Sequence, residues 1–367
     1  MNNTPKSPFK HILTAAFIAI LATFSVSAFA EETTENAEAK TEKKFDAGKL
    51  IIEHISDNHE WHLFGEGEHA VALPLPVILY TDKGLDIFSS GKFHHGEETV
   101  EGKYKYKLLE ENSHIVALNE AGEVDEAANK NIYDISITKN VATLLFSVTC
   151  LLWIFLSVAN AYKKNPNKAP SGMQSFVEPL IIFIRDEVAK PSIGKKYEKF
   201  VPYLLTVFFL ILFNNLLGLI PIMPGGANLS GNIAFTMVLA VITFVITSIN
   251  GTKHYWHHIF AMPGVPKPVL IILTPIEILG VFLKPFVLMI RLFANMTAGH
   301  IIALSFFAMI FIFGEMSAGA GLGVSVVSVA FTVFMGLLEL LVAFLQAYVF
   351  TLLSAMYFGN ALEEGHH

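Results

Sequence analysis

The chain has 367 residues, of which 53% are hydrophobic and only 16% are charged, with a formal net charge of -7. Soluble domains carry about 25% charged residues, so this composition excludes an ordinary soluble protein and indicates a membrane protein. The acidic residues are concentrated towards the N-terminus, and no basic cluster with interleaved aromatic residues suggests nucleic-acid binding.

Residues 1–30 are typical of a secretory signal peptide. Lys6 and Lys10 give a positive start, residues 12–24 form a short apolar run, and Ala-Phe-Ala at 28–30 is a cleavage signal. The run is shorter than the roughly 20 residues that a membrane span needs. We therefore expect cleavage, with an uncleaved first membrane helix as the alternative. Residues 31–49 are rich in Glu, Lys, Thr and Ala, and are expected to be a disordered linker.

Residues 50–131 are expected to form a small ordered module that contains β-strands. Strand-forming residues occupy 70–80 and 104–109, and residues 82–84 form a turn signal. If the signal peptide is cleaved, the module lies outside the inner membrane. A metal-binding module on a membrane anchor is one alternative, but the histidine spacings match no compact zinc pattern, so solvated or structural roles are favoured for His54, His59, His62, His69, His94 and His95.

The first membrane span is expected at 141–162, which contains no charged residue. Lys163, Lys164 and Lys168 follow it and indicate that this end is cytoplasmic. Residues 173–188 have apolar side chains on one helical face and charged side chains elsewhere. This pattern predicts an amphipathic helix on the membrane surface, the alternative being a helix packed on a soluble domain.

Residues 200–252 contain no Asp, Glu, Lys or Arg and are too long for a single span. Proline and glycine residues near their middle divide them into two expected helices, 201–220 and 232–249. Lys253 and Lys267 flank the segment that follows and place it in the cytoplasm.

Two longer apolar segments, 268–313 and 324–358, are separated by a Gly-rich stretch. Each exceeds the length of a single span, so each is expected to be tilted or bent. The sequence thus predicts an all-α polytopic membrane domain over 132–367, with five crossings, an extracytoplasmic mature N-terminus and a cytoplasmic C-terminus. No internal repeat is evident, which weakens the case for an inverted-repeat transporter.

Ionisable side chains inside the longer segments are candidate functional residues, because each costs about 2.5–3.5 kcal/mol and such groups by default mark an ion or proton path. Glu277, Lys284 and Arg291 are spaced by seven residues and form one helical stripe. Asn295 lies about 40° from Arg291 around the helix, whereas His300 points about 180° away. Arg291 and His300 are therefore expected to face different surroundings, one a neighbouring protein and the other an aqueous path.

The last segment contains one ionisable group, Glu339, with Gln346 seven residues later on the same face. An acid, an amide and an imidazole on neighbouring helices are suited to passing protons. Arg291 is not, because its guanidinium stays charged, so an electrostatic role is expected for it.

Simpler interpretations of these residues remain open. Lys284 could extend its amine towards a helix end. His300 and Glu339 could form only a structural bridge. Asn214 and Asn215, in the second span, are favoured to bond between helices rather than to contact protons.

Three sequence motifs resemble those of ATP synthase a subunits. KPFVLMIRLFANMTAGH at 284–300 is similar to the family's arginine signature, LQAYVF at 345–350 to its last-helix motif, and NLLGLIP at 215–221 to a third motif. Together they cover roughly 141–359. The arginine and glutamine motifs at this separation are highly specific.

The resemblance implies that Arg291 is the essential arginine opposite the ring of c subunits. It also implies that Asn295, His300, Glu339 and Gln346 line the proton path, with Glu277 near an aqueous mouth. Many bacterial members have an acid at the position of His300 and a histidine at that of Glu339, so the pair is exchanged here, as in mitochondrial members. Gly218 stands where many members have an acid.

The implied function is that of the non-catalytic proton-translocating stator subunit of a rotary motor, with two half-channels, in the bacterial inner membrane. The implied partners are the c ring, the b subunits of the peripheral stalk and the remaining synthase subunits, and no cofactor or metal is implied. The alternative function is a stand-alone proton-coupled secondary transporter.

Overall fold

The computed structural model describes residues 46–363 except 65–70, 97, 110–112, 120, 165–168, 221–224 and 263–264. The predicted signal peptide and residues 31–45 of the predicted linker lie outside the described residues. Helix α2, Ala47–Ile55, begins within the predicted linker. The linker prediction was wrong for residues 47–49, because the apolar residues that follow extend into an amphipathic helix whose first turn includes them.

The module after α2 is built from short antiparallel strands. β1 pairs with β2, β3 lies between β4 and β8, and β6 lies between β5 and β7. The elements are β1 (Glu60–Phe64), β2 (Val71–Pro74), β3 (Pro76–Thr81), β4 (Gly84–Ser89), η2 (Ser90–Gly96), β5 (Val100–Glu101), β6 (Lys105–Leu108), β7 (Ile115–Leu118), α3 (Glu126–Asn129) and β8 (Tyr133–Asp134).

The predicted β-containing module is therefore present, with strands in both segments that the sequence indicated. The turn signal at 82–84 joins β3 to β4, and Gly84 has a φ of 110°, a conformation that favours glycine. The module extends beyond the expected boundary at residue 131, because β8 pairs with β3. Val77, Leu79, Phe93 and Tyr106 are fully buried in its core.

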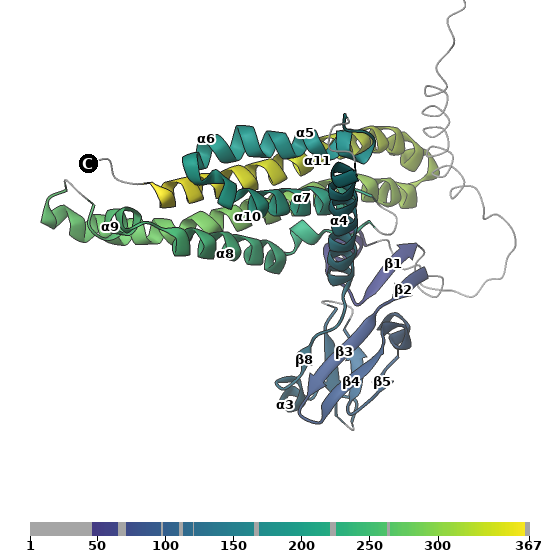
Figure 1. The fold of residues 1–367 in the computed structure, drawn as a ribbon. Coiled ribbons are helices and arrows are strands. Elements are labelled where there is room, and N and C mark those ends of the chain that lie inside the picture. The colour runs from purple at the N-terminus through teal and green to yellow at the C-terminus, as the bar shows by residue number, and fades with distance from the viewer. Residues whose placement is uncertain are drawn as a thin grey trace, which may run out of the picture. The chain divides into compact units, whose positions relative to one another are not determined.

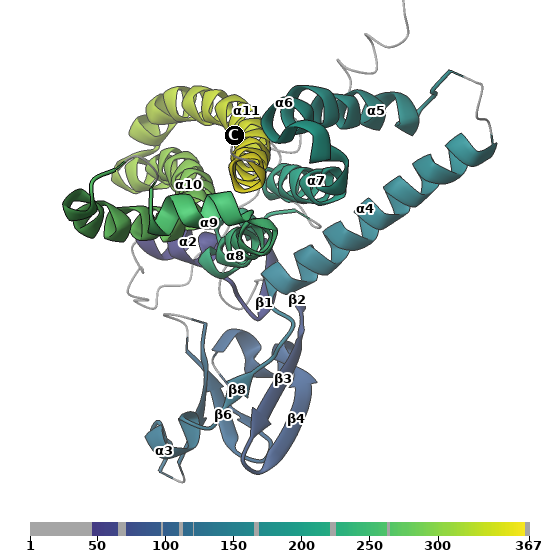
Figure 2. The same ribbon diagram turned by 60° about the vertical axis from the view of Figure 1, so that its left-hand side comes forward.

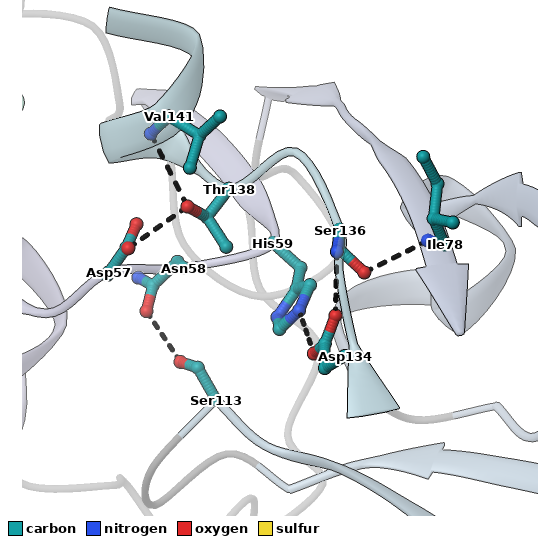
Figure 3. A network of polar contacts seen from close by, with 9 residues as sticks. All are labelled: Asp57, Asn58, His59, Ile78, Ser113, Asp134, Ser136, Thr138 and Val141. Atoms are coloured by element: carbon teal, nitrogen blue, oxygen red, sulfur yellow. Dashed lines mark hydrogen bonds and ion pairs between the residues drawn. The ribbon is translucent and has the colours of Figure 1, made fainter. Parts of the chain in front are cut away.

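A polar network joins the start of the module to the start of helix α4, Lys139–Lys164 (Figure 3). One Asp57 carboxylate oxygen accepts from the Asn140 amide (3.0 Å) and the other from the Thr138 hydroxyl (3.0 Å). The Lys139 amide donates to Asn58 O (2.9 Å), and the Lys139 amine to His54 O (3.1 Å). Residues 54–58 are thereby fastened to the first turn of α4.

A second contact in this network involves His59, which is only 5% exposed. Its Nε2 lies 2.8 Å from the Asp134 carboxylate on β8 (Figure 3). Burial opposes ionisation of Asp134, but hydrogen bonds from His59 and Ser136 outweigh it and lower the Asp134 pKa below its usual value. The pair ties the segment before β1 to the strand before α4.

The rest of the described chain is helical. It consists of α4, α5 (Met173–Phe183), the π-helical turn η3 (Ile184–Ala189), α6 (Lys190–Ile193), η4 (Gly194–Lys199), α7 (Val201–Gly218), η5 (Leu229–Gly231), α8 (Ile233–Asn250), α9 (Lys253–Phe260), α10 (Lys267–Met316) and α11 (Ala318–Leu362).

Five of these helices, α4, α7, α8, α10 and α11, are long and apolar enough to cross a membrane. They coincide with the five segments predicted from sequence, so the prediction of a mostly helical polytopic membrane protein is confirmed at this level. The expected Gly-rich interruption is much shorter than predicted, because α10 reaches Met316 and α11 begins at Ala318. Ser317 alone breaks the helix, and its hydroxyl accepts from the Ala320 amide (3.1 Å).

In Figure 1, the axes of α7, α8, α10 and α11 lie roughly along one line, whereas the axis of α4 crosses them. In Figure 2, α7 and α8 are seen nearly end-on and α4 at full length. The main core lies between α7, α10 and α11, where Leu204, Phe208, Leu288, Leu292 and Phe350 are almost completely buried. This core fixes the face that each long helix turns towards its neighbours.

Candidate functional site

Helix α10 presents different residues to its two sides. Leu288, Leu292 and Met296 follow one another at intervals of four residues and are buried in the core. Arg291 and Asn295, also four residues apart, are exposed. No carboxylate pairs with Arg291 among the described residues. Within the described part of the chain, the middle of this mostly apolar helix thus presents a guanidinium that no carboxylate pairs with.

His300 lies on the buried side of α10, and Arg291 is exposed, so the two have different surroundings, as their angular separation predicted. Its side chain is 7% exposed, and Nδ1 lies 3.5 Å from Oε1 of Glu339, which is 13% exposed. This distance fits an ion pair but is long for a hydrogen bond, and Glu339 Oε1 has no hydrogen-bond partner among the described residues. The structure therefore brings together the acid and the imidazole that the sequence singled out.

A glycine makes this approach possible. A Cβ atom at Gly299 would lie 2.7 Å from Glu339 Oε1, closer than carbon and oxygen normally come. Gly299 has no side chain that could bind or transfer a proton, and it was not predicted as a functional residue. Its role depends on the register between α10 and α11, which no local pattern reveals.

Gly218, at the end of α7, faces the other side of His300. A Cβ atom there would lie 3.7 Å from His300 Nε2 and 3.3 Å from Ala227 O. An acid in place of Gly218 would thus adjoin the imidazole, so positions 218, 300 and 339 belong to one site.

The candidate amides have different surroundings. Gln346, one of the predicted path residues, is 8% exposed on α11. Asn215 donates to Ala343 O of α11 (3.2 Å), so the expected bond between helices is found there. Asn214 instead donates to Leu210 O of its own helix (2.7 Å). The prediction of a bond between helices was therefore wrong for Asn214.

Glu277 and Lys284 lie towards the start of α10, apart from the His300–Glu339 pair. Lys284 lines a small cavity with room for about one water molecule, together with Tyr255 of α9 and Tyr357 of α11. Its Nζ lies 5.9 Å from the centre of the Tyr357 ring. Burial raises the pKa of Tyr255, and the Glu277 carboxylate adds to that rise. These groups form a second polar region, and the tyrosines in it were not predicted.

Among the described residues, no group of three or more His, Cys, Asp or Glu side chains is arranged to hold a metal ion. His59 contacts Asp134, and His94 Nε2 lies 3.7 Å from Glu98. Both are contacts within the module.

Comparison with protein families gave two matches. Residues 141–359 match the family described as ATP synthase A chain, and residues 50–135 match a domain of unknown function (DUF8433). The first match covers most of the helical region. The second corresponds to the β-containing module and assigns it no activity.

Curated bacterial proteins are similar over large parts of the chain. A protein of Chlorobaculum tepidum named ATP synthase subunit a 2 is 51% identical over 62% of this chain and 64% of its own length. A protein of Chlorobium luteolum with the same name is 45% identical over 82% of this chain and 90% of its own length. ATP synthase subunit a of Myxococcus xanthus is 40% identical over 68% of this chain and 80% of its own length.

Proposed function

The chain belongs to the ATP synthase A chain family, and we propose that it is the proton-translocating stator subunit of the Fo sector in a bacterial inner membrane. The observation that best supports a specific mechanism is the division of α10. Arg291 is exposed on one side, with no carboxylate partner among the residues that the structure describes, and His300 is buried beside Glu339 on the other. A proton path and a surface for a partner subunit are thereby separated on one helix.

In this proposal Arg291 faces the ring of c subunits. A guanidinium in an apolar membrane helix is costly unless a partner compensates it, and a carboxylate on the ring would do so. Because the guanidinium stays protonated, it cannot pass a proton itself. It instead favours the ionised form of the approaching carboxylate, which releases its proton before passing Arg291.

Two half-channels supply and remove the protons. We assign His300, Glu339 and Gln346 to one of them, with Asn295 beside Arg291 where the path meets the ring, and Glu277 to the mouth of the other. A proton that crosses the membrane gains about 2.3 kcal/mol per 100 mV. Because the half-channels are offset, the proton can complete its passage only if the ring turns.

The lengths of the last two helices support a strongly inclined arrangement. Helix α10 has 50 residues, which at 1.5 Å per residue is about 75 Å, whereas the hydrocarbon core is about 30 Å thick. We propose that α10 and α11 cross the membrane obliquely. Such an inclination lets each helix follow the ring over a longer distance than an upright helix would.

We propose the orientation from the charges at the ends of α4. Lys163 and Lys164 occupy its last turn and favour the cytoplasmic side. The module and the mature N-terminus then lie outside the inner membrane, and the C-terminus lies in the cytoplasm after five crossings. Helix α5 is placed on the cytoplasmic membrane surface.

Affinity purification of the tagged chain from its native membranes tests this function. We expect the c ring, the b subunits of the peripheral stalk and the other synthase subunits to co-purify. The reconstituted complex should acidify vesicles when ATP is added. A chain that purifies without c subunits and moves protons or a solute alone would contradict the proposal.

A further inference from the structure

The strands β4, β3 and β8, which lie side by side in Figure 1, present one apolar face that no described element covers. Because side chains alternate between the two faces of a strand, every second residue of these strands lies on this face. Its members form two rows of three across the strands, one row centred on Ile78 and the other on Tyr80. We call it the apolar sheet face, and it consists of Ile87, Ile78, Ile135, Leu85, Tyr80 and Tyr133.

The opposite face of the same three strands belongs to the interior of the module. Leu79 of β3 is fully buried there. Asp86 of β4 accepts from the Tyr106 hydroxyl (2.7 Å), and Asp134 of β8 contacts His59. These two aspartates are the charged residues of the three strands, and both alternate with members of the apolar sheet face. The apolar sheet face itself therefore carries no charge.

The apolar sheet face is large for a surface that meets water. Five of its six side chains are 49–65% exposed. Exposed fractions of this size on two tyrosines and three aliphatic side chains, with a smaller share from Ile78, amount to roughly 600 Å². The largest apolar patch on a typical monomer is about 300–600 Å² and is often functional. The size of this face therefore indicates a binding surface.

The chain itself offers no apolar cover in its two longest segments outside the described residues, once the predicted signal peptide is removed. Residues 31–45 contain five Glu and three Lys, and Phe45 is their only large apolar residue. Residues 65–70 read Gly-Glu-Gly-Glu-His-Ala. Charged segments of this kind favour water over an apolar surface. The apolar sheet face thus suits another molecule better than either segment.

A second copy of the same face has the shape and chemistry that this surface requires. Two sheets pack face to face about 10 Å apart, and a two-fold axis presents the same patch from both sides. Joining two such faces buries roughly 1,200 Å² in total, which reaches the range of specific, stable interfaces. Tyr80 and Tyr133, neighbours in one row, are of the residue type that anchors interfaces. Confinement of both copies to one membrane also raises their effective concentration.

We propose that the apolar sheet face joins two copies of this chain, module to module, on the side of the membrane where α4 begins. This pairing goes beyond the proposed function, because it uses none of the residues assigned to proton transport. Each module is fastened to its own membrane domain, since Asp57 accepts from the Asn140 amide and the Lys139 amine donates to His54 O. A pair of modules therefore holds two membrane domains next to each other.

Chemical cross-linking in native membranes tests this pairing on the full chain in its complex. Cys150→Ser first removes the only cysteine, and Tyr80→Cys then places one thiol on the apolar sheet face. Val124→Cys is the matched control, because Val124 is 49% exposed in the same module but lies outside this face. A bismaleimide that spans about 10 Å, the separation of two packed sheets, is then added to the membranes.

We expect Tyr80→Cys to give at least about tenfold more of the product that joins two chains than Val124→Cys gives. Adding Ile87→Asp to Tyr80→Cys places a carboxylate in the interface, which costs its hydration, and should lower the yield about tenfold. Ile87 is 65% exposed, so this change disturbs no buried contact. Unchanged resistance of the module to protease confirms that it stays folded, and Leu85→Asp replaces Ile87→Asp if that resistance is lost.

A yield from Tyr80→Cys no higher than that from Val124→Cys would overturn the pairing. A yield that the added aspartate leaves unchanged would overturn it too. A product that joins Tyr80→Cys to a different polypeptide would show that another protein occupies the apolar sheet face, and would also contradict the proposal. If Tyr80→Cys fails to assemble, Ile135→Cys, in the other row, takes its place. Proton pumping by the Cys150→Ser complex tests the proposed function separately.

Discussion

At the scale of single residues, Arg291 and His300 illustrate what helical geometry can predict. Their separation of nine residues placed them on opposite sides of a straight helix, and the structure has Arg291 exposed and His300 buried. The partner of His300 was not predictable from geometry, because it lies on another helix. The residues offered Glu339 as one possible partner and the family resemblance favoured it, and the 3.5 Å contact agrees with that pairing.

Exchanging the two residues tests whether they act together. His300→Glu alone leaves two carboxylates at one site and Glu339→His alone leaves two imidazoles, so each single change should slow proton passage by disturbing the protonation of the pair. The double exchange restores one group of each kind and should recover part of the rate. ATP-driven pumping is compared for all four forms at matched assembly. A double variant no better than the worse single variant would favour a purely structural bridge.

Gly299→Ala tests the close approach of Glu339 to α10. The added methyl group would have to displace the carboxylate, and overpacking of this kind costs about 1–3 kcal/mol. We expect clearly slower pumping, and we expect Gly280→Ala, where a Cβ atom meets nothing within 4 Å, to pump normally. Equal rates for the two variants at matched assembly would show that this contact is not needed.

At the scale of elements, the sequence located the spans well and their ends less well. A long apolar segment without charge defines a span almost by itself, because every backbone group in lipid must be bonded within a helix. The same requirement explains why helix α10 continues through Pro275 and Pro285 and why glycines at 319, 321 and 323 did not interrupt α11. Propensity would have broken these helices in water.

Unlike the membrane spans, most strands of the module could not be located from the sequence. They have two to six residues, and β1, β4, β5, β7 and β8 were not predicted. The identity of such short strands depends on their partners. The sequence indicated β3, but its pairing with β8 across more than fifty residues has no local signal.

Asp57→Ala tests the joint between the module and α4. The change removes the acceptor for the Asn140 amide and the Thr138 hydroxyl, and the loss of such a helix cap costs about 0.5–2 kcal/mol. Local opening should then make cleavage of residues 54–58 by an external protease about 2- to 30-fold faster. Asp57→Asn keeps one side-chain oxygen, so its cleavage rate should lie between those of the unchanged chain and Asp57→Ala. Unchanged cleavage in Asp57→Ala would mean that other contacts hold the joint.

At the scale of the whole molecule, the membrane class, the spans and the candidate residues were available from the sequence, but the burial of polar side chains between α4, η5 and α7 was not. Asn140, Asn228 and Ser230 are separated by up to ninety residues and are common polar residues in unremarkable positions. Only the contacts among α4, η5, α7 and α10 reveal that they are buried near one another without protein partners. Long-range packing, which local patterns do not encode, buries these side chains.

The central claim is that Arg291 acts on a partner carboxylate while the path lies elsewhere, and its replacement tests this most directly. ATP-driven pumping is measured in vesicles with a pH-sensitive dye, for complexes matched in assembly. We predict that Arg291→Lys lowers pumping by about 10²-fold or more, because a desolvated lysine can lose its proton and lacks the planar fork. Arg291→Ala should also block pumping, and should let protons leak passively past the ring. Normal pumping by either variant would contradict the account.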